Sequence, residues 1–169
     1  GDVVRASNGK TIEILNTDAE GRLTLADGLH YACKLDPDYI IDLATLTGAC
    51  VVALGEEISG IMGNDPKFVN QLITSSTEVG EKLWEMPLEK RYRSLIESDI
   101  ADVRNIAKSR YGGSLTAGLF LQEFVEEGRI WAHLDIAGPA FAEKPMSSYI
   151  QKGASGFGVR TLVNFLESI

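Results

Sequence analysis

The sequence predicts an α/β domain in which helices flank a mixed, mostly parallel β-sheet in αβα layers. Short apolar runs that resemble buried strands alternate with longer segments of helical periodicity, an order that favours layered α/β folds. The chain has 169 residues, 44% of them hydrophobic and 24% charged, so a sizeable core can form without disulfides. We therefore expect residues 1–169 to form one soluble domain.

The first part of the chain predicts a β-hairpin followed by a helix. Residues 2–5 and 11–14 are rich in β-branched side chains, and the segment between them contains Asn8-Gly9, a strong hairpin signal. A charged loop follows. Apolar side chains then recur at helical spacing at Leu25, Leu29 and Cys33. This helix is expected to end near Leu35, before the next proline.

Two short apolar runs in the middle of the chain predict strands. Residues 39–44 suit a buried parallel strand, and residues 58–62 could form a further one. Asp42 lies inside the first run, so its carboxylate must find hydrogen bonds or a partner charge if it is buried.

The remaining elements are mostly helical. A helix is predicted over residues 65–79, with a proline near its first position, and residues 81–98 look amphipathic with an interruption at a proline. Ser114 is expected to cap a further helix. Residues 130–136 predict a second buried strand, and residues 159–166 predict the last helix.

Net charge, hydropathy and cysteine spacing argue against several classes of function. The chain carries 16 Lys and Arg against 24 Asp and Glu, a net charge of −8, which argues against a nucleic-acid or anionic-membrane surface. No apolar stretch approaches the roughly 18–20 residues that a spanning helix needs. Cys33 and Cys50 have no metal-binding spacing and are predicted to be reduced thiols. We expect a cytoplasmic protein.

The segment NTDAEGRL, residues 16–23, is the main candidate for chemistry. Asp18, Glu20 and Arg22 occupy alternate positions, so their side chains would share one side of an extended chain. Carboxylates bind Zn²⁺, Mn²⁺ or Mg²⁺, and a guanidinium holds an anion or a developing oxyanion. Spacing alone somewhat favours the alternative, a polar loop in which Asp18 or Thr17 caps the next helix and Glu20 and Arg22 are solvated.

A second candidate pair lies in the predicted strand at 130–136. His133 and Asp135 alternate there and could share a face, although a hydrogen-bonded strand histidine is the other interpretation. The chain has two histidines, so a histidine-rich zinc site is excluded. A single-metal hydrolase using Asp18, Glu20 and His133 stays open.

The octapeptide at 16–23 resembles the signature of the leucyl aminopeptidase family. Similarity continues in IDLATLTGA at 41–49, GGSLTAGLFL at 112–121 and WAHLDIAGPA at 131–140, and covers essentially the whole chain. The resemblance implies a cytosolic, hexameric, two-metal aminopeptidase that removes Leu-like N-terminal residues from peptide substrates.

The resemblance also implies roles for individual residues. Asp18 and Glu20 would be ligands of two divalent metals, zinc or manganese, with Glu20 bridging them. Arg22 would be the catalytic arginine that holds a bicarbonate ion, and Asn16 would lie at the edge of the site. Substrate contacts are expected from two further motifs, at Thr45, Leu46, Gly48, Ala137 and Ala140.

The chain departs from the family in its metal ligands. Family members take a metal-binding lysine, further aspartates and a catalytic lysine from an upstream segment, and this chain has no such segment. The resemblance therefore predicts the C-terminal portion of a catalytic domain, inactive without the N-terminal domain and the upstream part of the same protein. The alternative is a non-catalytic structural or interaction fragment of a hexameric aminopeptidase with a DNA-binding role, which the net charge of −8 disfavours.

Overall fold

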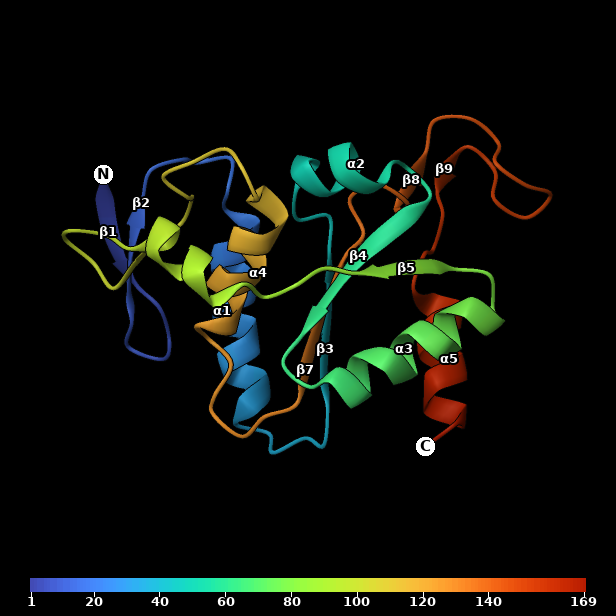
Figure 1. Ribbon diagram of the computed structural model, residues 1–169, viewed down its shortest axis with the longest axis horizontal. Helices are drawn as coiled ribbons and strands as arrows, with labels where there is room; N and C mark the ends of the chain where they lie inside the picture. Colours follow the sequence, from blue (N-terminus) through green and yellow to red (C-terminus); the bar gives the residue numbers. More distant parts are fainter. The chain divides into compact units, whose positions relative to one another are not determined.

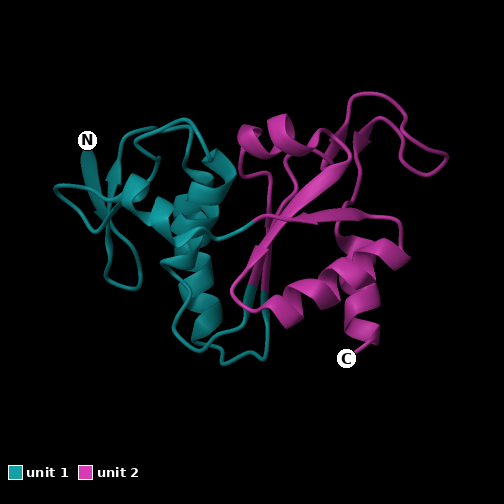
Figure 2. Ribbon diagram, in the orientation of Figure 1, with its two compact units in different colours: residues 1–40, 87–131 teal, residues 41–86, 132–169 magenta.

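The structure, a computed structural model, describes all residues from Gly1 to Ile169. The chain forms two compact units, which Figure 2 shows in different colours. Unit 1 comprises residues 1–40 and 87–131, and unit 2 comprises residues 41–86 and 132–169. Each unit is thus assembled from two separate stretches of sequence, so contacts between residues far apart in the chain decide both cores.

Unit 1 contains the predicted hairpin. Strand β1, Asp2–Arg5, pairs antiparallel with β2, Thr11–Ile14, and Gly9 in the connecting turn has φ of 90° (Figure 1). A left-handed turn position favours glycine, which explains the Asn-Gly signal. The two-residue strand β6, Val103–Arg104, extends this sheet by pairing parallel to β2.

Three helical segments complete unit 1. Helix α1, Gly21–Cys33, packs against α4, Gly113–Gln122, and the 3₁₀ helix η1, Lys90–Ile96, also contacts α4. The buried side chains of this core include Ala26, Leu29, Cys33, Ala117, Phe120, Leu121 and Phe124. The helical spacing read from the sequence is therefore the inward face of α1.

The start of α4 differs from the expectation. Gly112, with φ of 67°, is its N-cap residue, and no side chain caps the helix. Ser114, which was expected to cap it, is buried inside the first turn. A glycine can take the left-handed conformation that this chain reversal needs, so the helix begins one residue before the predicted cap.

Unit 2 is built on a mixed sheet of four strands in the order β3-β7-β4-β5. The strands are β3, Ile40–Ala44; β4, Ile58–Gly63; β5, Lys82–Glu85; and β7, Trp131–Asp135. The N–H of Ile136 donates to the carbonyl of Ala44, in a parallel register between β3 and β7. β4 is antiparallel to β7 and parallel to β5. The predicted mixed, mostly parallel sheet is confirmed.

Helices border this sheet. Helix α2, Gly48–Leu54, contacts β4, whereas α3, Pro66–Glu78, contacts β4 and β5 and also packs against α5, Val159–Glu167. The start of α3 is as predicted, because Asp65 accepts a hydrogen bond from the N–H of Phe68 and a proline follows it. Strands β8, Phe141–Ala142, and β9, Gly153–Ala154, form a small antiparallel ladder.

The segment at 81–98 is not one amphipathic element. Its first part is β5 and its later part is η1, with Pro87 between them. Proline interrupts regular backbone hydrogen bonding, so the strand does not continue through it. At the same point the chain passes from unit 2 to unit 1. None of the helices is both long enough and apolar enough to cross a membrane.

A charged cluster ties three parts of unit 1 together. Glu123, just after α4, accepts hydrogen bonds from Lys10 Nζ at 2.5 Å and from Arg93 Nε. Burial alone would raise the pKa of Glu123, but the hydrogen bonds and charges of Lys10 and Arg93 outweigh that effect and lower it. The hairpin, η1 and the end of α4 are thus joined through one carboxylate.

Glu123→Gln is expected to lower the free energy of unfolding by about 1–3 kcal/mol at neutral pH, because charged hydrogen bonds are lost in a partly buried place. Because the pKa of Glu123 is lower in the folded state than in the unfolded state, its ionised carboxylate stabilises the fold at pH values above the unfolded-state pKa. This stabilisation is lost as the pH falls through the folded-state pKa. Urea unfolding from pH 7 to pH 3 checks this. The difference between the variant and the unchanged chain should shrink below about pH 4. A difference that persists at pH 3 would contradict this assignment, and Glu127→Gln, at an exposed position, is the control.

Candidate active site

The acidic loop, residues 16–20, joins β2 to α1 in unit 1. The side-chain oxygen of Asn16 accepts from the N–H of Asp18 at 3.0 Å, and the Asn16 carbonyl accepts from the N–H of Ala19 at 3.3 Å. Glu20 is already helical in conformation and is the N-cap residue of α1. The segment is therefore a turn that leads into a helix, and the condition of an extended chain, under which the three side chains would share one side, is not met.

The two carboxylates of this loop face solvent. Asp18 and Glu20 are both exposed, and no side chain caps the N-terminus of α1. The alternative in which Asp18 or Thr17 caps this helix is therefore wrong. Because both side chains are exposed, their carboxylate oxygens are accessible to a cation.

Arg22 lies in the first turn of α1 and is half-buried. Its Nη1 donates to the carbonyl of Asn105 at 2.8 Å, and its guanidinium carbon lies 5.9 Å from the centroid of the Phe120 ring. The interpretation of Arg22 as a solvated charge is therefore wrong. The side chain has a defined orientation two residues from Glu20.

Asn105, which follows β6 directly, was not predicted as part of the site. It is fully buried, and its side chain contacts the main chain of Leu15 and Asn16. No spacing in the sequence indicates that a residue of the segment 98–105 would reach the acidic loop. The hydrogen-bond partners of Asn105 lie 83 to 92 residues away in the chain.

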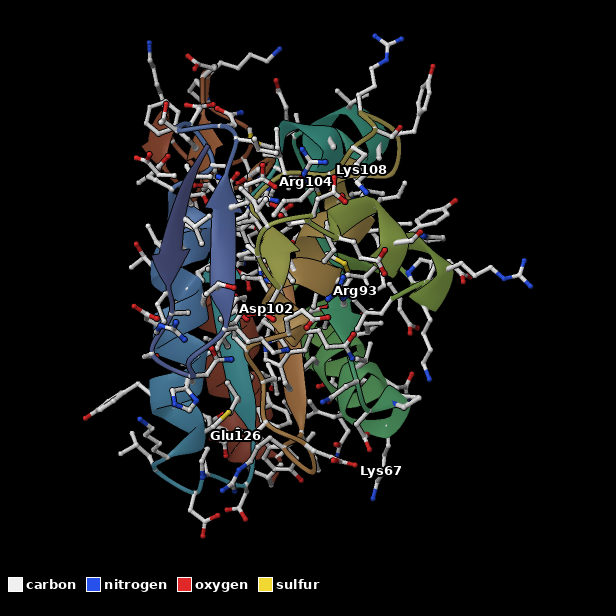
Figure 3. The ribbon with its side chains drawn as sticks, turned by 90° about the vertical axis from the view of Figure 1, so that its left-hand side faces the viewer. Lys67, Arg93, Asp102, Arg104, Lys108 and Glu126 are labelled. Atoms are coloured by element: carbon white, nitrogen blue, oxygen red, sulfur yellow. The ribbon has the colours of Figure 1, made fainter.

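The strand that precedes Asn105, β6, is itself tied to the hairpin. Asp102 accepts hydrogen bonds from the N–H and the hydroxyl of Thr11, both at 2.7 Å. These hydrogen bonds hold the pKa of Asp102 below its usual value. Figure 3 labels Asp102 and Arg104, which bracket Val103 in this region. β6, although it is only two residues long, is therefore held by hydrogen bonds on both sides, at Asp102 and at Asn105.

The predicted substrate-contacting residues lie in unit 2, on the loops after β3 and β7 and at Gly48, the first residue of α2. Thr45, Leu46 and Gly48 follow β3, and Ala137 and Ala140 follow β7. Because these two strands are parallel neighbours, both loops leave the same edge of the sheet, where open α/β sheets bind their ligands. Thr45 and Gly48 are exposed, whereas the other three are partly buried.

Asp135 at the end of β7 joins these two loops. Its fully buried carboxylate accepts from the N–H of Leu46 at 3.1 Å, from the N–H of Thr47 at 3.3 Å and from the Thr47 hydroxyl at 2.6 Å. It also accepts from the N–H of Ala137 at 3.3 Å. One buried charge thus sets the conformation of both loops through hydrogen bonds to their main chains.

His133 and Asp42 form a separate buried pair. His133 Nδ1 lies 2.6 Å from Asp42 Oδ1, and the histidine side chain is fully buried. This is the hydrogen-bonded strand histidine that was one of the two interpretations, and it supplies the partner that Asp42 needed. Neither unit by itself gathers a group of three or more His, Cys, Asp or Glu able to hold a metal. The single-metal interpretation combines Asp18 and Glu20 of unit 1 with His133 of unit 2, so no single unit contains that site.

Gly138 lets the loop after β7 approach another main chain. A Cβ atom at this position would lie 2.3 Å from the carbonyl oxygen of Gly55, a distance that no side chain can adopt. Since the obstacle is backbone, it cannot move aside cheaply, and glycine is the residue that fits. The loop that carries Ala137 and Ala140 is therefore held from both sides, by Asp135 and by this close contact.

The two carboxylates of the acidic loop are suitable metal ligands, but two ligands are too few for a complete site. Asp18 and Glu20 offer carboxylate oxygens, which suit zinc or manganese, but two carboxylates do not complete a two-metal site. A two-metal centre that includes these residues needs further ligands besides them.

The acidic loop, with its exposed carboxylates beside an arginine of defined orientation, and the loops after β3 and β7 are the candidate site of this α/β fold. The model described as "Cytosol aminopeptidase family, catalytic domain" matches residues 1–163, and the chain belongs to this family. The expected resemblance and fold class are thereby confirmed.

Relatives and a solved structure agree with this assignment. A "Probable cytosol aminopeptidase" of Prochlorococcus marinus is 58% identical over 165 residues, which is 98% of this chain and 33% of that protein. One of Wolinella succinogenes is 57% identical over 170 residues, 99% of this chain and 35% of that protein. A structure of a tomato leucine aminopeptidase mutant matches with a TM-score of 0.94 at 47% identity, covering 100% of this chain and 32% of that one. The chain spans about a third of the length of these proteins.

Proposed function

We propose that this chain supplies part of the active site of a metal-dependent aminopeptidase that removes Leu-like N-terminal residues from peptides. The observation that carries the proposal is the geometry of the acidic loop. Its two carboxylates are exposed and do not cap helix α1, and an arginine of defined orientation follows them. The family membership supports the same reaction class. Each of the three side chains has a role that its chemistry allows.

Asp18 and Glu20 would bind two divalent metals, zinc or manganese, with Glu20 between them. Such metals polarise the scissile carbonyl and lower the pKa of bound water. Arg22 would hold an anion, for which bicarbonate is the candidate, next to the reacting carbonyl. Its guanidinium cannot lose its proton at physiological pH, so its task is to hold negative charge rather than to transfer its own proton.

The loops of unit 2 would bind the peptide. Main-chain groups of Thr45, Leu46 and Gly48 would form hydrogen bonds to an extended peptide, except for the Leu46 N–H, which already donates to Asp135. Ala137 and Ala140 have small side chains and leave room for an apolar side chain at the N-terminal position of the substrate.

The site would be completed from outside this chain. Further metal ligands and a second cationic group would come from an upstream part of the same protein, and without them residues 1–169 would be inactive. The complete protein would be a cytoplasmic homohexamer, and Asn16 would lie at the edge of its metal site. In the tests below, the full-length protein is this chain joined in one polypeptide to the remaining two thirds of the Prochlorococcus relative.

Metal removal tests the proposed function. Dialysis of the full-length protein against a chelator should abolish release of p-nitroaniline from leucine p-nitroanilide, and added Mn²⁺ or Zn²⁺ should restore it. The control is circular dichroism before and after dialysis, which separates metal loss from unfolding. Hydrolysis that survives complete metal removal would refute the proposal.

A further inference from the structure

We propose that Asn105 is a positioning residue of this site, which holds the acidic loop and the Arg22 guanidinium in one arrangement. The proposal rests on the proposed function, in which Asp18, Glu20 and Arg22 act on the substrate. Asn105 itself has no exposed surface and is not expected to touch metal or substrate. It acts through the residues that it binds.

The side chain of Asn105 holds the start of the acidic loop through both ends of its amide. Its Oδ1 accepts from the N–H of Leu15 at 2.9 Å and from the N–H of Asn16 at 3.4 Å, and its Nδ2 donates to the carbonyl of Asn16 at 2.6 Å. These hydrogen bonds need an acceptor and a donor on one short side chain, which an amide has and a carboxylate does not. The residue type is therefore explained by the contacts.

The main chain of Asn105 holds the other end of the motif. Its carbonyl accepts from Arg22 Nη1 at 2.8 Å, and its N–H donates to the carbonyl of Glu13 at 3.0 Å. One residue thus contacts the chain before the two acidic side chains and the arginine after them. Because its own N–H is anchored to β2, movement of Asn105 would move both ends together.

This link matters because the acidic side chains lie on an exposed turn. Asp18 and Glu20 face solvent, and a mobile turn would have to be ordered at the cost of conformational entropy each time the reacting groups assemble. Hydrogen bonds from a buried residue keep the turn ordered before the reacting groups assemble, so this entropy is not lost again in each reaction. The expected consequence of losing them is a slower chemical step rather than weaker binding of the peptide.

Hydrogen exchange on this chain tests the structural half of the proposal. In Asn105→Ala the amides of Leu15 and Asn16 should exchange at least about tenfold faster, because their acceptor is gone. Asn8→Ala is the matched control, since Asn8 also bridges loops of unit 1 but does not contact the acidic loop. Unchanged exchange in Asn105→Ala, with the chain folded, would overturn the proposal.

Steady-state kinetics of the full-length protein test the functional half. Asn105→Ala should lower kcat at least about tenfold and leave KM within about twofold, because the predicted peptide-binding loops are in unit 2. Asn105→Asp keeps the volume and the acceptor but loses the donor to Asn16, so it serves if the alanine variant does not fold, and its kcat should also fall. Unchanged kcat, or a loss that appears only in KM, would overturn the positioning role. If the unchanged full-length protein shows no chelator-sensitive hydrolysis, the proposed function and the catalytic part of this inference both fail, and the exchange rates alone decide whether Asn105 holds the loop.

Discussion

Glu20→Gln in the full-length protein is expected to lower kcat for leucine p-nitroanilide by at least about 100-fold. The amide has nearly the shape of the carboxylate but lacks the negative charge that binds a metal, and Glu20 is proposed to contact both ions. Since the side chain is exposed and does not cap α1, the substitution should leave the stability of the fold unchanged. Kinetics at saturating Mn²⁺, together with metal content by atomic absorption, check the expectation.

The matched control is Glu127→Gln. Glu127 is exposed in unit 1 and lies in the loop after α4, so the variant makes the same change of charge away from the acidic loop. It should keep the kcat of the unchanged protein. An active Glu20→Gln variant with full metal content would show that Glu20 is not a ligand.

Asp135→Ala should produce the largest loss of stability of any single substitution considered for this chain. It removes the acceptor of three main-chain N–H groups and one hydroxyl in a buried place. Each buried donor left without a partner costs about 1–3 kcal/mol, although nearby water and loop movement recover part of the total. We expect the free energy of unfolding to fall by about 3–5 kcal/mol, measured by urea unfolding.

Two further variants sharpen this result. Asp135→Asn keeps an acceptor oxygen and can donate to the Thr47 hydroxyl, so it should lose less stability than the alanine variant. Asp38→Ala, at an exposed position, should leave stability within about 0.5 kcal/mol. Equal stability of Asp135→Ala and Asp38→Ala would show that the carboxylate does not hold the loops of unit 2.

The elements that sequence predicted well are those with local causes. Asn8-Gly9 sets the hairpin turn, and Asp65 followed by proline starts α3, because each signal acts within a few residues. Expectations failed where tertiary context decides. Ser114 is a good cap by type, but the left-handed Gly112 begins α4 instead. The acidic loop is a turn because Asn16 receives hydrogen bonds from the chain that follows it.

The candidate site likewise has a part that short motifs predict and a part that depends on long-range contacts. The acidic loop and the peptide-binding loops could be proposed from short motifs, since those residues are neighbours in sequence. The supporting contacts of Asn105 and Asp135 join residues up to 92 positions apart, and neither periodicity nor spacing indicates such partners. They become visible only when the pairing of β6 with β2 and of β7 with β3 is known.

The central claim is that this chain carries two metal ligands and an arginine of a site that other segments complete. The most direct test is the release of p-nitroaniline from leucine p-nitroanilide, with Mn²⁺, by three samples. These are this chain alone, the remaining two thirds of the Prochlorococcus relative alone, and the two mixed after refolding together. Activity in the mixture only, absent when the chain carries Glu20→Gln, is the predicted result. Sustained, chelator-sensitive activity of the chain alone would contradict the claim, because residues 1–169 would then hold a complete site.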